Sequence, residues 1–259
     1  MRKIVFILGH LIWRPKVIYY YYIFKRFGWK AENSLKNELI KNSALVEDNV
    51  ELSFNRMKVS TKNDLRYLNY NPKSGVKGRT GGSTGQPLHY VMNNSFYSKG
   101  YSLLYLGWAN GGYQLGDRVA ILAGGSLIGK RQSIASKVKD FILNFRHYSS
   151  YGMKESQLEK YYADMVANEV EFLRGYASSI YEFCLFIKSR NLQGLRLKAV
   201  FTTSEKLTPK YRKLIESVLL VDVYDQYGLN DGGISAYECK FHTGMHVYEG
   251  RAHCAVINE

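Results

Sequence analysis

Short apolar runs alternate with longer helical segments along most of this chain, and this alternation restricts the folds that it can adopt. The runs 119–123, 197–202 and 220–224 are rich in apolar and β-branched residues, which indicates buried strands. The helices expected around them are 95–106, 133–145, 155–173, 179–189 and 209–218. Strands that alternate with helices favour a mainly parallel sheet with helices on its faces. We therefore predict an α/β fold, in which ligands bind at the carboxyl ends of the strands.

Length and composition agree with a folded core. The chain has 259 residues, of which 46% are hydrophobic, so it can bury a sizeable interior. This length suits one large domain or two closely packed α/β lobes. No low-complexity linker and no internal repeat divides the sequence.

A loop rich in glycine and hydroxyl groups, Thr80-Gly81-Gly82-Ser83-Thr84-Gly85-Gln86-Pro87, is a candidate binding site. Glycines allow the backbone to approach an anion closely, and successive N–H groups together with Ser and Thr hydroxyls then surround phosphate oxygens. Pro87 ends the loop and directs the chain into an extended segment, 88–91. The loop matches neither of the two common nucleotide fingerprints, because no Lys follows its last glycine and no Gly-x-Gly-x-x-Gly is present. An ordinary glycine-rich hairpin or linker is the alternative.

Two further segments follow predicted strands. Thr203-Ser204-Glu205 comes directly after the run 197–202, and Asp225-Gln226-Tyr227-Gly228-Leu229-Asn230-Asp231 comes directly after the run 220–224. Together with the loop, and in this order, these segments resemble three signature motifs of the adenylate-forming ligases, the acyl-CoA synthetase superfamily. The resemblance extends from Pro72 to the end of the chain. It implies the fold of the large N-terminal domain of such an enzyme, with mainly parallel sheets flanked by helices.

The resemblance implies a role for each segment. The loop holds the triphosphate of ATP, Ser204 and Glu205 border the adenine, and the ring of Tyr227 stacks on it. Asp231 helps to hold Mg²⁺, and Thr84 and Asp231 are the residues expected to act in catalysis. The residues expected to bind the nucleotide are Thr80, Gly81, Gly82, Ser83, Thr84, Gly85, Ser204, Glu205, Asp225, Tyr227 and Gly228.

Two departures from the family pattern bear on activity. Asp231 stands where the family usually has Glu, and its shorter side chain could move a magnesium ligand by about 1 Å. Alternatively, Asp231 is only a turn residue before Gly232-Gly233. Family members also continue into a small C-terminal subdomain that carries a catalytic Lys. The resemblance therefore predicts a chain that is truncated before this subdomain.

Finer likeness points to one branch of the superfamily. Arg174-Gly175-Tyr176-Ala177-Ser178-Ser179, the segment 108–117 and Glu238-Cys239 resemble the phenylacetate-coenzyme A ligase group, especially its capsule-biosynthesis members. This implies that a carboxylic acid attacks ATP to give an acyl-adenylate, and that a thiol such as coenzyme A then takes the acyl group. The alternative is a non-catalytic or split-enzyme partner in polysaccharide biosynthesis. We expect a basic and aromatic helical region, 1–71, and an incomplete AMP-binding core, 72–259.

The net charge of +14 raises the question of nucleic-acid binding. Lys and Arg are spread along the chain rather than gathered in one stripe, and no helix-turn-helix, zinc-finger or RNA-recognition signature is present. A basic surface also attracts ATP, acyl-CoA or an anionic membrane. We therefore expect no nucleic-acid partner.

The first thirty residues are basic and aromatic. No acidic residue precedes Glu32, and Lys and Arg residues surround the apolar and aromatic run 17–24. This run is too short to span a bilayer, which needs ~20 residues. Tyrosines flanked by basic residues suit a membrane interface, so a peripheral membrane contact through residues 1–30 is expected. A helix docked on the enzyme lobe is the alternative.

The cysteines and histidines bear on location and metal binding. Three cysteines form no paired framework, which favours the cytoplasm, at the inner face of the membrane if residues 1–30 bind there. Cys184 lies in an apolar helix, where a small core residue is expected. A denser group has spacings that zinc could use, with Cys239 and His246 as candidate ligands, against the alternative of polar loop residues. Its members are Cys239, His242, His246, His253 and Cys254.

Overall fold

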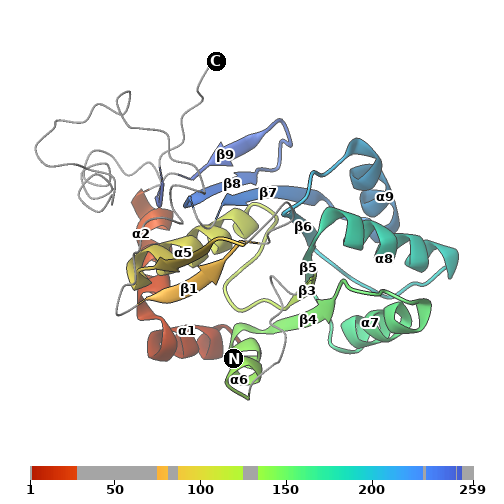
Figure 1. Cartoon of the computed structure of the whole chain (residues 1–259). Coiled ribbons are helices and arrows are strands. Elements are labelled where there is room, and N and C mark those ends of the chain that lie inside the picture. Colours follow the sequence, from red (N-terminus) through yellow and green to blue (C-terminus); the bar gives the residue numbers. More distant parts are fainter. Residues whose placement is uncertain are drawn as a thin grey trace, which may run out of the picture.

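The computed structural model describes residues 2–27, 75–80, 87–124, 134–229, 232–248 and 250–252. Within these ranges the chain forms a large sheet, a two-stranded hairpin and helices that pack on the sheet (Figure 1). The helices are α1 (Arg2–Trp13), α2 (Pro15–Phe27), α5 (Asn94–Ala109), α6 (Ile134–Leu143), α7 (Glu155–Ala167), α8 (Ala177–Ser189) and α9 (Pro209–Leu219). The strands are β1 (Val76–Arg79), β2 (His89–Met92), β3 (Val119–Ala123), β4 (Phe145–Ser149), β5 (Phe172–Gly175), β6 (Ala199–Thr203), β7 (Val223–Leu229), β8 (Ile234–Glu238) and β9 (Met245–Val247).

The large sheet has the strand order β4-β3-β5-β6-β7-β8-β9. The strands from β4 to β7 run parallel, whereas β8 and β9 are antiparallel to their neighbours. Every residue of β3 and β6 is buried, as expected for parallel strands that helices cover on both faces. The predicted α/β fold with a mainly parallel sheet is confirmed.

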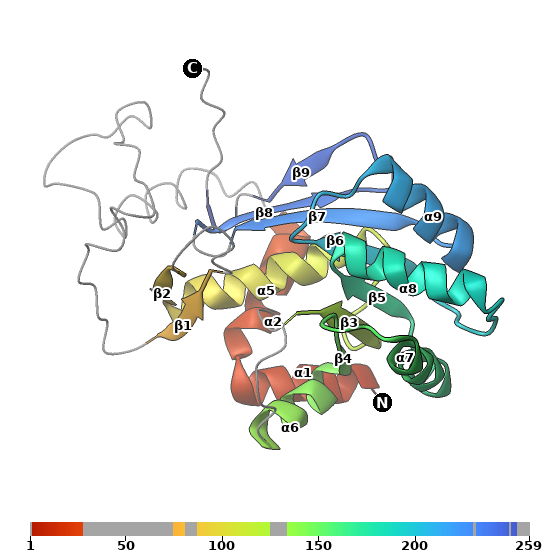
Figure 2. The same cartoon turned by 45° about the vertical axis from the view of Figure 1, so that its right-hand side comes forward.

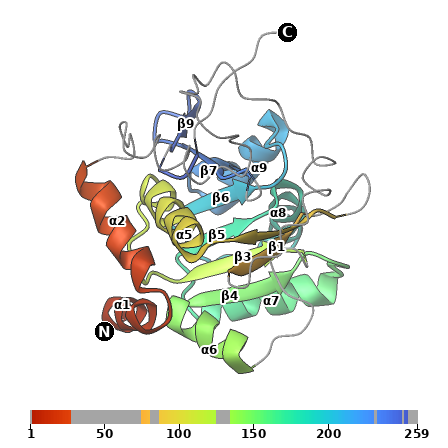
Figure 3. The same ribbon diagram turned by 60° about the vertical axis from the view of Figure 1, so that its left-hand side comes forward.

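Each face of the sheet has its own helix layer (Figure 2, Figure 3). On β3, Ala120 and Leu122 belong to the core that α7, α8 and α9 cover. Val119, Ile121 and Ala123 belong to the opposite core, which α1, α2 and α5 cover. This alternation follows from strand geometry, because successive side chains point to opposite faces of a sheet.

Two predicted helices are wrong at their carboxyl ends, where each gives way to a strand. The helix expected at 133–145 ends at Leu143, and β4 begins after Asn144, whose φ of 56° lies in the left-handed region. The helix expected at 155–173 ends at Ala167, and β5 begins at Phe172. Both β4 and β5 pair with β3, so a long-range contact that no local pattern contains decides their conformation.

The position of the Asp225–Asp231 motif also differs from the expectation. We expected a strand at 220–224 followed by the motif, but β7 begins at Val223 and continues to Leu229. The antiparallel partner β8 extends it, because Gln226 to Leu229 pair with Tyr237 to Ile234. Most of the motif is therefore strand rather than loop.

The two N-terminal helices pack against α5. Phe6, Val17 and Tyr21 are buried in the same core as the aromatic residues of α5. The Ser102 hydroxyl of α5 donates a hydrogen bond to the Val17 carbonyl oxygen of α2 at 2.8 Å. In the described part of the chain, no helix combines the length and the apolar character that crossing a bilayer requires.

Candidate functional site

The β1–β2 hairpin carries the glycine-rich loop, and Thr80 closes it. The Thr80 N–H donates to the Leu88 carbonyl oxygen at 3.0 Å, and the Leu88 N–H donates to Thr80 Oγ1 at 2.9 Å. These reciprocal bonds hold both ends of the loop together. The predicted phosphate-binding residues Gly81, Gly82, Ser83, Thr84 and Gly85 lie outside the described residues.

A cavity of about 470 Å³ lies between this hairpin, α5 and the carboxyl ends of β6 and β7. Its volume falls in the range of about 300–1,000 Å³ that is usual for small-molecule sites. The cavity brings together Ser204, Tyr227 and Gly228 with Arg79, the residue before Thr80. Residues from distant parts of the sequence thus meet at the sheet edge where ligands were predicted to bind.

Ser204 and Glu205 form a turn after β6. Ser204 has a φ of 66°, in the left-handed region that non-glycine residues rarely adopt. The Ser178 N–H, in the first turn of α8, donates to Glu205 Oε2 at 3.0 Å. A carboxylate at this place satisfies an otherwise free N–H group and stabilises the positive end of the helix dipole. Ser204 reaches the cavity, whereas Glu205 acts as a helix cap, a role that the sequence did not reveal.

Tyr227 and Gly228 present an open surface to the cavity. The side chain of Tyr227 is 52% exposed, and no atom of the described residues lies within 4 Å of a Cβ atom built on Gly228. An aromatic ring of this exposure beside a glycine leaves room for a planar group to stack on the ring.

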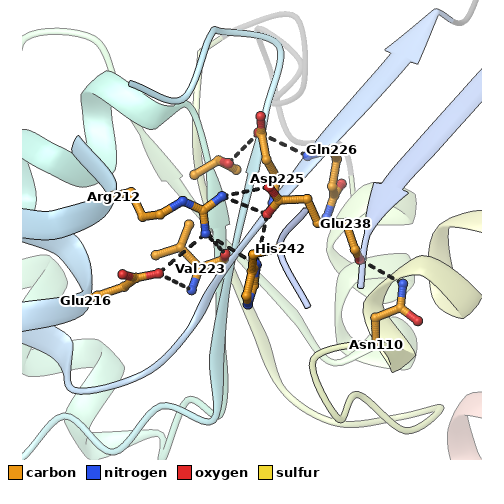
Figure 4. A network of polar contacts seen from close by, with 9 residues as sticks. Asn110, Arg212, Glu216, Val223, Asp225, Gln226, Glu238 and His242 are labelled. Carbon is orange, nitrogen blue, oxygen red and sulfur yellow. Dashed lines mark hydrogen bonds and ion pairs between the residues drawn. The ribbon is translucent and has the colours of Figure 1, made fainter. Parts of the chain in front are cut away.

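Asp225 does not line the cavity but connects β6 to β7 (Figure 4). Thr202 Oγ1 donates to Asp225 Oδ1 at 2.6 Å, and the Gln226 N–H donates to the same oxygen at 3.0 Å. Burial raises the pKa of the Asp225 carboxyl above its usual value, although these two hydrogen bonds act in the opposite direction. Asp225 therefore positions the strand ends that carry Ser204 and Tyr227.

A second layer of polar contacts supports Asp225. Arg212 Nη2 donates to both carboxylate oxygens of Glu238 at 2.8 and 2.7 Å, and the Asp225 N–H donates to Glu238 Oε2 at 2.9 Å. His242 Nδ1 lies 3.2 Å from the same oxygen. Burial raises the pKa of the Glu238 carboxyl, but the hydrogen bonds from Arg212, Asp225 and His242 outweigh it and hold the pKa below its usual value. The sequence predicted no role for Arg212, which reaches this network from α9 (Figure 4).

The described residues give the zinc expectation no support. Cys239 follows β8, His246 lies exposed on β9, and His242 is bound to Glu238. Within the described ranges, no three His, Cys, Asp or Glu side chains are placed to hold a metal ion. Asp231, His253 and Cys254 lie outside those ranges, so the Mg²⁺ ligand predicted at Asp231 stays a prediction.

The aromatic residues of α5 and of the turn after it divide between core and cavity. Tyr105, Trp108 and Tyr113 are buried, and Trp108 stacks on Phe201 of β6 with ring centroids 5.5 Å apart. Tyr101 lines the cavity. The prediction that Cys184 is a core residue is confirmed, since its thiol is fully buried in α8 and burial raises its pKa to about 12.

The cavity is strongly cationic. Lys77, Arg79, Arg174 and Arg251 line it, and its described lining contains no Asp or Glu. The hairpin, β5 and the segment 250–252 each contribute to this cluster. Because these segments are far apart in the sequence, the cluster could not be predicted from it. A cavity of this charge favours an anionic ligand.

The sheet, its helix layers and the hairpin form the fold of the large N-terminal domain of adenylate-forming enzymes. A solved structure of 2-hydroxyisobutyryl-CoA ligase in an open conformation, in complex with 2-HIB-AMP and CoA, is similar with a TM-score of 0.55 and 18% identity. The match covers 73% of this chain and 47% of that chain.

The same ligase in its thioesterification state, again with 2-HIB-AMP and CoA, is similar with a TM-score of 0.51 and 18% identity. This match covers 73% of this chain and 43% of that chain, so the chain spans less than half of the length of both structures. No protein-family model matches the sequence, and no curated protein matches it significantly. At this identity the similarity establishes the fold, and the reaction has to be argued from the site.

Proposed function

We propose that this chain is the ATP-binding part of an adenylate-forming acid-thiol ligase. In this reaction a carboxylic acid attacks ATP to give an acyl-adenylate and pyrophosphate, and a thiol such as coenzyme A then takes the acyl group. The observation that carries the proposal is the cationic cavity that joins the loop hairpin to Ser204, Tyr227 and Gly228. The complexes of the similar ligase with 2-HIB-AMP and CoA support the choice of ligands.

The described lining of the cavity suits a nucleotide. The exposed ring of Tyr227 would stack on the adenine, Ser204 would border it, and Asp225 would hold the strand ends in register. The hairpin cations would attract the triphosphate toward Thr80. Mg²⁺ would neutralise the phosphate charge, with Asp231 as its proposed ligand.

The loop residues Gly81 to Gly85 are proposed to act through the same electrostatic principle. Their backbone N–H groups and the Ser83 and Thr84 hydroxyls would bind the β- and γ-phosphates, and Thr84 is the loop residue proposed to act in catalysis. Donors that are fixed before the reaction stabilise developing charge without reorganisation at that moment.

The finer assignment is also a proposal. We propose the phenylacetate-CoA ligase-like branch and a role in capsule or exopolysaccharide biosynthesis, with a core that begins at residue 72. The second candidate is a non-catalytic or split-enzyme partner that retains the fold. One measurement separates an enzyme from a non-catalytic scaffold. A split enzyme regains acid-dependent pyrophosphate exchange when its missing chain is added, whereas a scaffold does not.

We expect ATP-Mg²⁺ to raise the thermal unfolding midpoint of the chain and Tyr227→Ala to reduce this shift. A ligand at 100 times its Kd adds about 2.7 kcal/mol of apparent stability. Loss of base stacking on an aromatic ring costs about 1–3 kcal/mol, so the Kd for ATP should rise roughly 5- to 150-fold. Differential scanning fluorimetry across an ATP titration measures both effects.

Tyr22→Ala is the matched control, since Tyr22 is also about half exposed but lies on α2, away from the cavity. It should leave the ATP-dependent shift unchanged. Absence of any shift at millimolar ATP-Mg²⁺ in the unmodified chain would overturn the ligase proposal and favour the scaffold.

We also propose a peripheral contact between the N-terminal helices and the inner face of an anionic membrane. Ile4, Leu8, Leu11 and Ile12 of α1 are 62%, 53%, 49% and 88% exposed. No acidic residue lies in α1 or α2, so the charge around this apolar face is positive. An exposed apolar face with a basic surround is typical of helices that lie in the membrane interface.

The double variant Leu8→Ser/Ile12→Ser is expected to bind vesicles that contain phosphatidylglycerol at least tenfold more weakly. Each apolar side chain transferred from water to lipid contributes about 1.5–3 kcal/mol. Co-sedimentation measures the change, and Leu220→Ser, at a residue that is 85% exposed on the opposite side of the core, is the control. Equal binding of both variants would exclude this contact.

A further inference from the structure

Buried nitrogen donors at the cavity lack a hydrogen-bond acceptor among the described residues. They include Nε of Arg174 on β5 and Nε2 of Gln226 on β7, both shielded from solvent. Arg174 and Gln226 both line the cavity. A buried polar group without a partner costs free energy, and an arginine can only donate hydrogen bonds. The partner that these groups lack is therefore an acceptor.

The surroundings of Arg174 supply no negative charge. Its guanidinium lies 5.6 Å from the centroid of the Trp108 ring, and its ionisable neighbours include His147 and the phenols of Tyr101, Tyr176 and Tyr237. Burial lowers the pKa of the Arg174 guanidinium. No Asp or Glu of the described chain forms an ion pair with Arg174. A charge in such a place is costly unless a ligand neutralises it.

The position of Arg174 separates it from the proposed phosphate site. Lys77 and Arg79 are on the hairpin next to the glycine-rich loop, whereas Arg174 is on β5, in the middle of the large sheet. The guanidinium of Arg251 packs on the Phe96 ring at 4.4 Å, and Arg251 has a further partner. Among the described residues, Arg174 is therefore a lining cation that stands apart from the hairpin and has no carboxylate partner. Tyr101 and Tyr237 beside it provide apolar surface for a carbon chain.

We propose that Arg174 binds a second carboxylate of the acid that is activated, so that the substrate is a dicarboxylic acid. This inference rests on the proposed function for the fate of the first carboxylate, which attacks ATP at the loop. The second carboxylate pairs with the guanidinium through two parallel N–H···O bonds, the geometry that arginine favours with carboxylates. Gln226 Nε2 supplies a further donor at the wall of the cavity. Arg174 is thus a specificity-determining residue.

The test compares matched acids that differ by one carboxylate. Isothermal titration of the full chain, with and without ATP-Mg²⁺, uses the pairs succinate and butyrate, glutarate and valerate, and terephthalate and 4-methylbenzoate. At least one diacid is expected to bind tenfold or more tightly than its matched monoacid. Arg174→Met should abolish this preference, while Arg174→Lys should retain part of it.

Each outcome decides the inference. Equal affinity within every pair in the unmodified chain would overturn it, and this comparison requires no variant to fold. A preference for diacids that survives in Arg174→Met would overturn the assignment to Arg174. If ATP binds but no diacid is preferred, the inference fails and the proposed function stands. If diacids are preferred but ATP does not bind, the anion site stands and the proposed function fails.

Discussion

Replacement of Phe201 with alanine is expected to lower the free energy of unfolding by about 4 kcal/mol. Phe201 is fully buried at the centre of β6, where its ring stacks on Phe172 and Trp108 with centroid distances of 5.7 and 5.5 Å. The variant loses the transfer free energy of the ring and leaves a cavity that the flanking rings cannot fill. Urea denaturation followed by circular dichroism measures the change.

Phe241→Ala is the control for this substitution. Phe241 is 70% exposed in the turn after β8, so its removal should change stability by less than about 0.5 kcal/mol. Phe241→Ala and Phe201→Ala remove the same side-chain atoms, the first at the surface and the second in the core. A loss below about 1 kcal/mol for Phe201→Ala would contradict the central position of this ring in the core.

Glu238→Gln is expected to lower the free energy of unfolding by about 3 kcal/mol at pH 7. The side chains of Glu238 and Arg212 are 10% and 24% exposed, so the variant removes the closer of two carboxylates from a largely buried guanidinium and, among the described residues, leaves only Glu216, at 3.4 Å. The amide also brings a donor to a place where the Asp225 N–H and Arg212 already donate. Because the hydrogen bonds of a buried network strengthen one another, replacing one residue of it costs more stability than loss of the Arg212–Glu238 pair alone.

The same network predicts a dependence on pH. The pKa of Glu238 is lower in the folded chain than its ordinary value of 4.5, so the unfolded chain binds the proton more tightly. The contribution of Glu238 is therefore complete above about pH 4.5 and is lost as the pH falls through the folded-state pKa. Urea denaturation between pH 7 and pH 3 should show the difference between Glu238→Gln and the unmodified chain narrowing at acid pH.

Glu155→Gln provides the matched comparison for the charge. Glu155 pairs with Arg190 at the surface, where the two side chains are 60% and 57% exposed, and such pairs contribute about 0–1 kcal/mol. An equal loss of stability from Glu155→Gln and Glu238→Gln would show that burial of the Arg212 pair has no energetic consequence. Because Glu238 also holds the Asp225 N–H, we expect its variant alone to loosen the strand ends at the cavity.

Several parts of the fold could be predicted because their signal is local. The residues of β3 and β6 form continuous apolar and β-branched runs, which is the pattern of strands buried on both faces. Since parallel strands end at the same edge of a sheet, Ser204 and Tyr227 were expected to lie close together, and both line the cavity. Local spacing thus determined the class of fold and the edge that carries the candidate site.

Other elements could not be predicted because their conformation depends on partners. Phe145 to Ser149 and Phe172 to Gly175 follow helices without a strong break in pattern, and they become strands by pairing with β3. The long-range bonds of Asn144 act in the same way, since its side chain bonds Gly116 and Arg118 while its backbone is left-handed. No window of sequence around these residues contains the groups that decide their structure.

The sequence by itself determined that the chain is an α/β protein with strand-end motifs that resemble those of adenylate-forming enzymes. Only the tertiary structure decided which charges act together. Lys77, Arg79, Arg174 and Arg251 are spread over the sequence and meet in one cavity, whereas Glu205 is directed away to cap α8. The physical reason is that electrostatic energy depends on distance through space and on local burial, and the topology of the sheet sets both.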